Sequence, residues 1–186
     1  MKRFFDLFLG LTLFILLFLL MLIIAIAIRI TSKGPLIYWS YRIGINNTTF
    51  KMPKFRSMRV ETPDLATHLL ENPEKFLSPI GGFLRRTSLD EIPQLFSIIK
   101  GDMSFIGPRP ALYNQDDLIT LRTKNNIDSL KPGLTGWAQI NGRDSLSINE
   151  KVALEVEYIN KKSIWIDIKI LWLTLLKVFI KHDISH

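Results

Sequence analysis

The hydrophobic and polar positions of this chain divide it near residue 30, because residues 7–28 form an uncharged, almost wholly apolar run. As a helix, these 22 residues would extend roughly 33 Å at ~1.5 Å per residue, enough to cross a hydrocarbon core of ~30 Å. A cleaved signal peptide has an apolar region of only about 7–15 residues, followed by a small-residue cleavage site. The longer run favours a membrane anchor over residues 1–30 and a second domain over residues 31–186.

Basic residues flank the anchor on both sides. Lys2 and Arg3 precede the apolar run, and Arg29, Lys33 and Arg42 follow it. The positive-inside rule favours basic flanks in the cytoplasm. Two basic ends suit a helix that enters and leaves by the same leaflet, and they also suit a spanning helix with a weak orientation bias. Charge counting leaves both topologies open.

Downstream of the anchor, the pattern predicts a mostly helical α/β domain. Residues 35–39 are apolar and are expected to form a short extended stretch near the membrane surface. Gly44, Asn46 and Asn47 then indicate a turn. The nine prolines all lie in this second domain.

Apolar residues at helical spacing predict three helices in the second domain. The leucines at 65, 69 and 70 predict a short helix within residues 62–78. Longer helices are predicted over residues 148–161 and from 164 to 180. The last of these carries two tryptophans and a basic fringe, which is typical of an interfacial membrane helix and equally of a core helix.

A further helix is predicted to begin beside the acidic pair Asp90 and Glu91. Ser88 and Glu91 match the S-x-x-E capping box, which would start the helix at Ser88. Pro93 favours a start at the proline itself, since a proline inside the helix would leave a carbonyl unpaired. Either start places the acidic pair next to a helix N-terminus, and the helix is expected to end near Gly101.

The amino-acid composition excludes several classes of protein and of functional site. Hydrophobic residues make up 47% of the chain and charged residues 22%, which is too apolar for a disordered protein. The chain has no cysteine, which excludes a disulfide scaffold, a thiolate zinc site, an iron–sulfur cluster and a cysteine nucleophile. The net charge is +7 and the pI about 9.7, so anionic partners are expected.

Lys54, Arg56 and Arg59 form a basic strip around Phe55. Such a strip can bind nucleic acid, but an anionic lipid surface is the more economical partner beside a membrane anchor. No helix-turn-helix or zinc-finger pattern is present, so no nucleic-acid partner is expected. The strip supports one alternative function, a non-catalytic anchored scaffold that binds anionic lipid.

Asp90 and Glu91 are the first candidates for chemistry. Acidic residues at this position also stabilise a helix simply through its macrodipole. The functional interpretation rests on Arg85 and Arg86, because a carboxylate attacks phosphorus only where cations offset the repulsion between two anions. Basic residues and a bound Mg²⁺ would supply that charge. Neighbouring helix positions diverge by ~100°, so the two carboxylates are expected to do different jobs.

Arg109 is the second candidate, because Pro108 and Pro110 hold it rigidly on both sides. A guanidinium binds phosphate through its planar fork. A loop arginine can equally satisfy backbone carbonyls, and both interpretations stay open. Arg143, which follows an Asn-Gly turn signal, is a further loop cation.

In their order along the chain, these motifs resemble those of the bacterial sugar transferases, the monotopic phosphoglycosyl transferases. The chain is similar to the minimal single-domain form, without the extra N-terminal membrane helices of longer members. The resemblance runs nearly end to end, over residues 2–6 (KRFFD), 34–35 (GP), Arg42 and Gly44, 54–58 (KFRSM), 87–95 (TSLDEIPQL), 101–110 (GDMSFIGPRP) and 131–143 (KPGLTGWAQINGR).

The resemblance implies transfer of a sugar 1-phosphate from a UDP-sugar to a polyprenyl phosphate such as undecaprenyl phosphate, with release of UMP, as the first membrane step of glycan assembly. It implies that Asp90 forms a covalent phosphosugar intermediate in a ping-pong sequence. Glu91 would be the second member of the catalytic dyad, and Mg²⁺ would be required and bound at Asp90. Arg109 would hold a phosphate. Weaker candidates for binding phosphate or nucleotide are Arg85, Arg86, Lys54 and Arg143.

The resemblance also implies a location and partners. The expected location is the bacterial inner membrane, with the catalytic domain on the cytoplasmic face and amphipathic helices at the bilayer surface. An anchor with exposed apolar surface permits a homodimer. In the family a Ser-Pro pair usually breaks the anchor into a re-entrant helix, but neither residue stands near Phe18 and Leu19. The expected re-entrant helix therefore has no local signal for its break.

Overall fold

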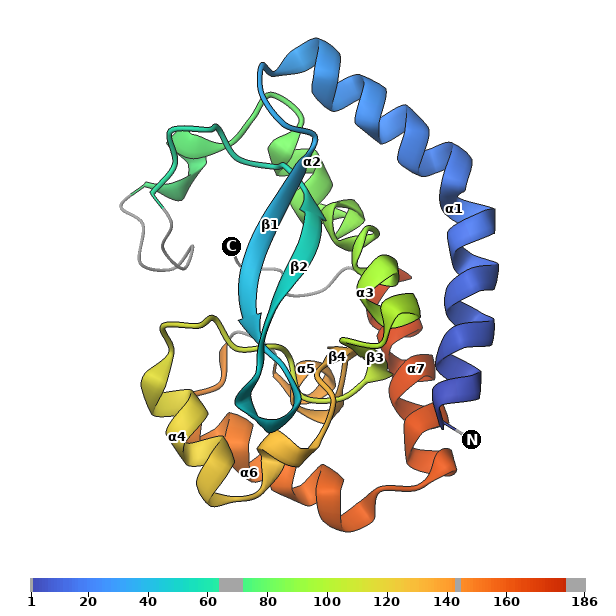
Figure 1. The fold of residues 1–186 in the computed structure, drawn as a ribbon, viewed down its shortest axis with the longest axis vertical. Helices are drawn as coiled ribbons and strands as arrows, with labels where there is room; N and C mark the ends of the chain where they lie inside the picture. Colours follow the sequence, from blue (N-terminus) through green and yellow to red (C-terminus); the bar gives the residue numbers. More distant parts are fainter. Residues whose placement is uncertain (1, 64–71, 143–144, 180–186) are drawn as a thin grey trace.

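The computed structural model describes residues 2–63, 72–142 and 145–179. The fold is mostly helical, with two small two-stranded sheets (Figure 1). The helices are α1 (Lys2–Thr31), α2 (Gly81–Arg86), α3 (Gln94–Lys100), α4 (Asp116–Lys124), α5 (Trp137–Asn141), α6 (Ile148–Lys161) and α7 (Ile164–Phe179). Short 3₁₀ turns are η1 (Ile45–Asn47), η3 (Pro73–Phe76), η4 (Leu89–Glu91) and η5 (Ile127–Ser129). The strands are β1 (Ile37–Ile43), β2 (Thr49–Phe55), β3 (Ser104–Ile106) and β4 (Gly133–Thr135).

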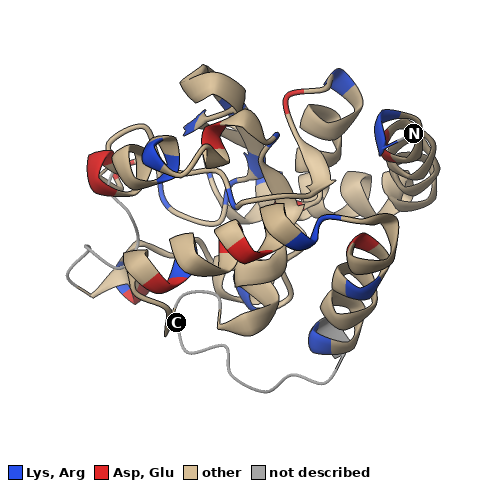
Figure 2. Cartoon of the chain, turned by 90° about the horizontal axis from the view of Figure 1, so that it is seen from below, with Lys and Arg blue, Asp and Glu red and all other residues tan. Residues whose placement is uncertain are grey.

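Helix α1 is one unbroken helix of 30 residues that curves along the outside of the molecule, beside α3 and α7 (Figure 1). Among the described residues it is the helix that is long and apolar enough to cross a membrane, by length and composition. Most of its apolar side chains face outward, and little of its most apolar stretch is buried. Its charged residues lie near its ends, as the end-on view of its N-terminus in Figure 2 illustrates.

One side of α1 packs on the rest of the chain along its whole length. Near its N-terminus Gly10 permits a close approach, since a Cβ there would lie 3.3 Å from the Ile99 side chain of α3. Near its C-terminus, Ile24 and Ile28 are buried in a cluster with Phe55 and Leu84. The helix is therefore integrated into the fold at both ends.

Strands β1 and β2 form an antiparallel hairpin that runs from Ile37 opposite Phe55 to Ile43 opposite Thr49. The predicted turn is confirmed, because Asn46 and Asn47 adopt left-handed backbone conformations at φ 52° and 58° in η1. Pro53 lies within β2, which is an edge strand among the described residues, and a proline with its missing N–H is tolerated on an edge strand.

Strands β3 and β4 pair in parallel, and three glycines let the segment after β3 approach the backbone before, within and after β4. A Cβ on Gly107 would overlap the Lys131 carbonyl oxygen, and one on Gly136 would overlap the Gly107 carbonyl oxygen. Gly133 is equally blocked by the Gly107 amide. The Gly-Pro-Arg-Pro and Lys-Pro-Gly-Leu-Thr-Gly segments therefore pack backbone to backbone.

Two of the predicted helices match the structure closely. Helix α6 covers residues 148–161 as expected, and Ser147 and Glu150 form a reciprocal capping box at its start. Helix α7 covers residues 164–179 of the predicted 164–180, and residue 180 lies outside the described residues. The helix predicted within 62–78 falls largely outside the described residues; residues 62 and 63 are not helical, and η3 is a single 3₁₀ turn.

The capping box predicted at Ser88 is wrong. Ser88 has a left-handed backbone, with φ 57°, and its side chain makes no capping hydrogen bond. The acidic pair lies on η4, and α3 begins after Pro93, as the alternative start predicted. The predicted end is confirmed at Gly101, whose φ of 105° suits glycine.

Candidate active site

The 3₁₀ turn η4 presents Asp90 and Glu91 between α2 and α3. Leu89 and Ile92, on either side of the pair, pack against the apolar cluster beneath the C-terminal half of α1. The left-handed Ser88 turns the chain immediately before η4. The acidic pair therefore has a rigid base, and its two carboxylates reach different surroundings.

Glu91 is held by two cations. Its Oε1 atom accepts hydrogen bonds from Lys54 Nζ at 2.7 Å and from Arg109 Nη2 at 2.9 Å. Burial alone would raise the pKa of Glu91, but the charges and hydrogen bonds of Arg109 and Lys54 outweigh burial and hold that pKa well below its usual range. Glu91 is therefore ionised, and it fixes both cations beside Asp90.

Asp90 is only 8% exposed, and its surroundings differ from those of Glu91. Burial raises the pKa of the Asp90 carboxyl, and the charge of Glu91 adds to that effect. The Lys54 and Arg85 charges oppose the increase. In the described part of the chain no cation lies within ion-pair distance of the Asp90 carboxylate. Asp90 is thus the less restrained and more basic carboxylate of the pair, which suits a nucleophile.

Lys54 reaches the site from the end of β2. Burial lowers the pKa of its ammonium group, and the Glu91 charge acts against that shift. The side chain is half-buried and directed at the acidic pair, so it faces into the molecule.

Arg109 reaches the site from the loop after β3. Pro108 and Pro110 on either side of it are both buried, and the packed glycines fix the backbone before it. Its ion pair with Glu91 shows that the proline-flanked arginine binds an anionic group. Arg109 therefore forms an ion pair with a carboxylate of its own chain, and phosphate binding by Arg109 stays a prediction.

The other predicted cations differ in their positions. Arg85, on α2, acts on the Asp90 pKa through its charge and also contacts the Met58 sulfur at 3.5 Å. Arg86 is exposed on the same helix, and its guanidinium lies near Gly82, so the structure does not bring it to the acidic pair. Arg143 lies outside the described residues.

Sequence reasoning missed Arg42 as a site residue. Its Nε donates to Ser40 Oγ at 2.9 Å and its Nη1 to the Pro110 carbonyl at 3.1 Å, so it braces the loop that carries Arg109. Its charge also lowers the pKa of Lys54. The sequence does contain a signal for the Ser40–Arg42 contact, because the arginine follows the serine by two residues within a stretch that is rich in aromatic residues.

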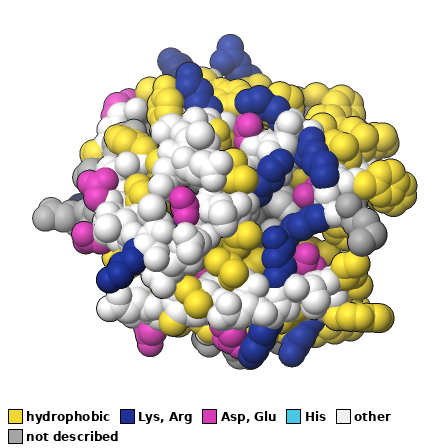
Figure 3. Space-filling view, turned by 60° about the horizontal axis from the view of Figure 1, so that its bottom comes forward, with side chains coloured by type: hydrophobic (Ala, Val, Ile, Leu, Met, Phe, Trp, Pro, Cys, Tyr) yellow, Lys and Arg dark blue, Asp and Glu magenta, His cyan; other side chains and the backbone are white. Residues whose placement is uncertain are grey.

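The predicted basic strip is not a surface strip. Lys54 points at Glu91, and Arg56 is 5% exposed and donates from Nη2 to the Ser32 carbonyl and hydroxyl oxygens, each at 3.0 Å. Only Arg59 of the three is exposed. On the face in Figure 3, lysine and arginine side chains gather around acidic ones, beside exposed hydrophobic side chains. This mixed arrangement differs from a uniformly cationic lipid-binding face.

The residues at the site suit a metal ion that is shared with a phosphate ligand. No group of three metal-ligating side chains occurs among the residues that the structure describes. Mg²⁺, however, commonly binds through one or two carboxylates together with substrate phosphates and water. With Glu91 engaged by two cations, the Asp90 carboxylate is the side-chain oxygen ligand that could hold Mg²⁺ together with a phosphate.

The family model described as bacterial sugar transferase matches residues 1–181. The chain belongs to the bacterial sugar transferase family. It is 37% identical to an uncharacterized sugar transferase, EpsL, of Bacillus subtilis, over 100% of this chain and 90% of that protein. It is 39% identical to the UDP-glucose:undecaprenyl-phosphate glucose-1-phosphate transferase of Escherichia coli, over 97% of this chain and 40% of that protein.

A third relative is the undecaprenyl-phosphate galactose phosphotransferase of Salmonella typhimurium, which is 34% identical over 81% of this chain and 34% of that protein. The chain therefore spans well under half the length of these two characterised relatives. The expectation of family membership is confirmed.

Proposed function

We propose that this protein transfers a sugar 1-phosphate from a UDP-sugar to a polyprenyl phosphate and releases UMP. The observation that carries the proposal is the arrangement of Asp90 beside a Glu91 that binds both Lys54 and Arg109. The names of two relatives, which specify glucose-1-phosphate transfer and galactose phosphotransfer with undecaprenyl phosphate, support the same reaction class.

In the first step, an Asp90 carboxylate oxygen attacks the phosphorus that carries the sugar. A bond forms between that oxygen and phosphorus, and the bond from phosphorus to the bridging oxygen breaks, so UMP leaves with the electron pair. Lys54 and Arg109 lie where they can offset the negative charge of the diphosphate. Asp90 would be the residue that holds Mg²⁺, and the ion would supply Lewis-acid activation when bound.

In the second step, a phosphate oxygen of the polyprenyl phosphate attacks the same phosphorus. The bond from phosphorus to the Asp90 oxygen breaks, which restores the carboxylate and yields a polyprenyl diphosphate sugar. Splitting the transfer lets one site serve a soluble donor and a lipid acceptor in turn. The Arg109 ion pair with Glu91 keeps a cation at the site through both steps.

The proposal includes a membrane position for the molecule. The outward face of α7 is strongly exposed, with Trp165 81% exposed, and α7 lies beside α1 (Figure 1). Exposed tryptophans beside apolar residues are typical of helices at a membrane interface. This exposure favours an interfacial α7 over a core helix.

Both ends of α1 contact the same body of the protein, which supports a monotopic anchor. A helix that crossed the bilayer would carry one end about 30 Å away from that body. Here Lys2 hydrogen-bonds to the Ile106 carbonyl, while Ile28 is fully buried at the other end. We therefore place both ends on the cytoplasmic side of the inner membrane, with the outward face of the helix in lipid.

Release of UMP tests the proposal. The full chain, in detergent or membranes, is incubated with UDP-glucose, UDP-galactose or UDP-N-acetylhexosamines. UMP release that needs both Mg²⁺ and polyprenyl phosphate is the expected result. Absence of UMP with every donor would favour the anchored scaffold, a function that the inward direction of Lys54 and Arg56 already disfavours.

A further inference from the structure

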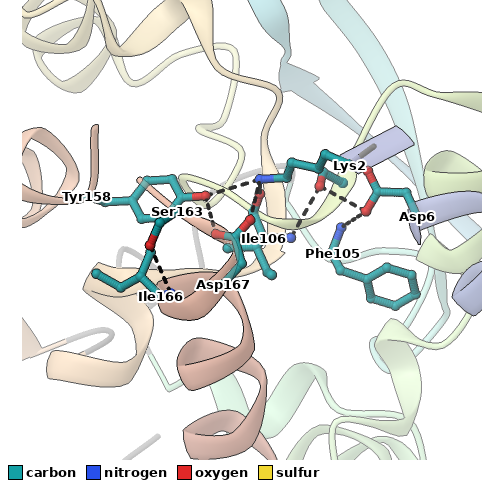
Figure 4. Close-up of polar contacts among 9 residues, drawn as sticks. Lys2, Asp6, Phe105, Ile106, Tyr158, Ser163, Ile166 and Asp167 are labelled. Atoms are coloured by element: carbon teal, nitrogen blue, oxygen red, sulfur yellow. Dashed lines mark hydrogen bonds and ion pairs between the residues drawn. The ribbon is translucent and has the colours of Figure 1, made fainter. Parts of the chain in front are cut away.

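The first two turns of α1 contain charged residues that face the body of the protein. The Asp6 side chain lies in a candidate membrane helix yet is only 3% exposed. Its Oδ1 accepts hydrogen bonds from Ser104 Oγ at 3.0 Å and from the Phe105 amide at 3.1 Å (Figure 4). A buried carboxylate is costly unless it is hydrogen-bonded, and these two bonds compensate it.

The partners of Asp6 lie on the open edge of β3. Among the described residues this strand pairs with β4 on one side, and no strand pairs with the Phe105 amide on its other side. Lys2 completes this edge, since its Nζ donates to the Ile106 carbonyl at 2.9 Å (Figure 4). Side chains of α1 therefore take the place of a third strand.

Lys2 is itself held by the C-terminal helices. Its Nζ donates to Tyr158 Oη on α6 at 3.1 Å and lies 3.5 Å from Asp167 Oδ2 on α7. Tyr158 in turn donates to Asp167 Oδ1 at 2.7 Å. The network thus joins four elements, α1, β3, α6 and α7, around the start of α1 (Figure 4).

The same turns of α1 lead to both halves of the active site. Ile106 is followed directly by the loop that presents Arg109, which binds Glu91. Arg3 donates to the Ile98 and Ile99 carbonyls at 2.6 Å each, at the end of α3, whose start follows the acidic pair. The start of α1 therefore contacts the strand that leads into the Arg109 loop. It also contacts the end of α3, the helix that follows Asp90 and Glu91.

We propose that Asp6 and Lys2 are positioning residues for the transfer reaction, which hold the open edge of β3 so that the following loop presents Arg109 to Glu91 and to the donor phosphate. The inference rests on the proposed function. It gives α1 a second role, because the helix then positions an active-site loop in addition to anchoring the protein in the membrane. A helix that served only as an anchor would have no effect on the first half-reaction, because the donor is soluble.

Two substitutions of Asp6 separate positioning from anchoring. Asp6→Leu makes α1 more apolar, so membrane attachment is retained, but it removes both acceptor bonds. Asp6→Asn keeps an oxygen that can accept from Ser104 and Phe105. Thr12→Val is the matched control, because Thr12 is exposed on the same helix and its hydroxyl donates to the Phe8 carbonyl one turn before it.

The first measurement is transfer of β-³²P-labelled donor to the protein without acceptor. We expect Asp6→Leu to label about 10- to 100-fold more slowly than wild type, the size of loss that a small misplacement of reacting groups causes. We expect Asp6→Asn to stay within about threefold and Thr12→Val to match wild type, in line with that scale. Labelling of Asp6→Leu at the wild-type rate would overturn the inference.

The second measurement is amide hydrogen exchange of the membrane-bound protein without donor, so it does not depend on the proposed function. We expect faster exchange in residues 104–109 of Asp6→Leu, with α6 unchanged. Unchanged exchange there, or equal acceleration throughout the chain, would contradict a local positioning role.

If Asp6→Leu does not fold, Ser104→Ala removes one of the two hydrogen bonds to Asp6, and we expect it to show the same local acceleration of exchange. Absence of labelling in wild type would refute the proposed function, and the exchange result would still decide the role of Asp6.

Discussion

Lys54 Nζ lies 2.7 Å from Glu91 Oε1, although the two residues come from β2 and η4 and are 37 positions apart in the sequence. Arg109 binds the same oxygen from a third segment. This contact divides the roles of the adjacent carboxylates. Glu91 holds cations in place, and Asp90 stays available for reaction.

Substitution of Glu91 tests that division. We expect Glu91→Gln to fold and to slow covalent labelling about 10- to 100-fold, because Lys54 and Arg109 lose the charge that orients them. The rate of labelling by a UDP-sugar measures the effect. Glu74→Gln is the control, since the Glu74 side chain is exposed on η3. Equal rates in Glu91→Gln and wild type would show that Glu91 does not position the cations.

The pH dependence of labelling reports on Asp90. Burial raises the pKa of its carboxyl and the Lys54 charge lowers it, and the net effect is an increase from the ordinary value of aspartate. Because only the carboxylate attacks, the rate must fall as the pH decreases through this raised pKa. Lys54→Met removes a cation that favours the carboxylate, so the acid limb should move to still higher pH, while Lys54→Arg should leave it nearly in place. The shift is measured from pH–rate profiles in which each variant's rates are normalised to its own maximum. Movement of the acid side of the Lys54→Met profile to lower pH would contradict the assignment of that side to Asp90.

Removal of Mg²⁺ should abolish labelling without loss of structure. The described residues contain no cluster that would hold the ion without a phosphate ligand. We therefore expect EDTA to stop labelling, and we expect Mg²⁺ to raise the thermal unfolding temperature only when a UDP-sugar is present. Labelling that persists in EDTA would refute the metal requirement, and tight Mg²⁺ binding without donor would refute a shared site.

The topology of α1 can be read with single cysteines, because the natural chain has none. One is inserted between Met1 and Lys2, and another replaces Lys33 at the other end of the anchor. A membrane-impermeant maleimide should label both only after the cytoplasmic face is opened, because both ends of α1 contact the same body. Labelling of the first cysteine on intact cells would demonstrate a spanning helix.

Local sequence signals predicted local structure well and distant contacts poorly. The pattern S-x-x-E occurs twice, at Ser147 and at Ser88, and only the first forms a capping box. At the second, the glutamate is taken by Lys54 and Arg109, which lie far away in the sequence. The capping-box pattern depends only on residues that are close in the sequence, so it gives no information about a competing ion pair with distant residues.

The charged residues of the anchor show the same limit. Lys2 and Arg3 suggested a basic membrane flank, yet both donate to backbone carbonyls about a hundred positions away. Arg42 also counted as a flanking charge, and it braces the Arg109 loop instead. Asp90 and Glu91 could be selected from the sequence because the residues on either side of them form a recognisable motif. The partners of Lys2, Arg3 and Arg42 depend on contacts between distant segments, which the sequence pattern does not indicate.

Covalent labelling of Asp90 tests the central claim most directly. The wild-type protein is mixed with Mg²⁺ and a UDP-sugar that is radioactive in the phosphate next to the sugar, without acceptor, and is then chased with polyprenyl phosphate. We predict label on the protein that maps to the peptide containing Asp90, transfers to lipid in the chase, and is absent in a folded, membrane-bound Asp90→Asn variant. Full turnover by Asp90→Asn, or label on any other residue, would contradict the account.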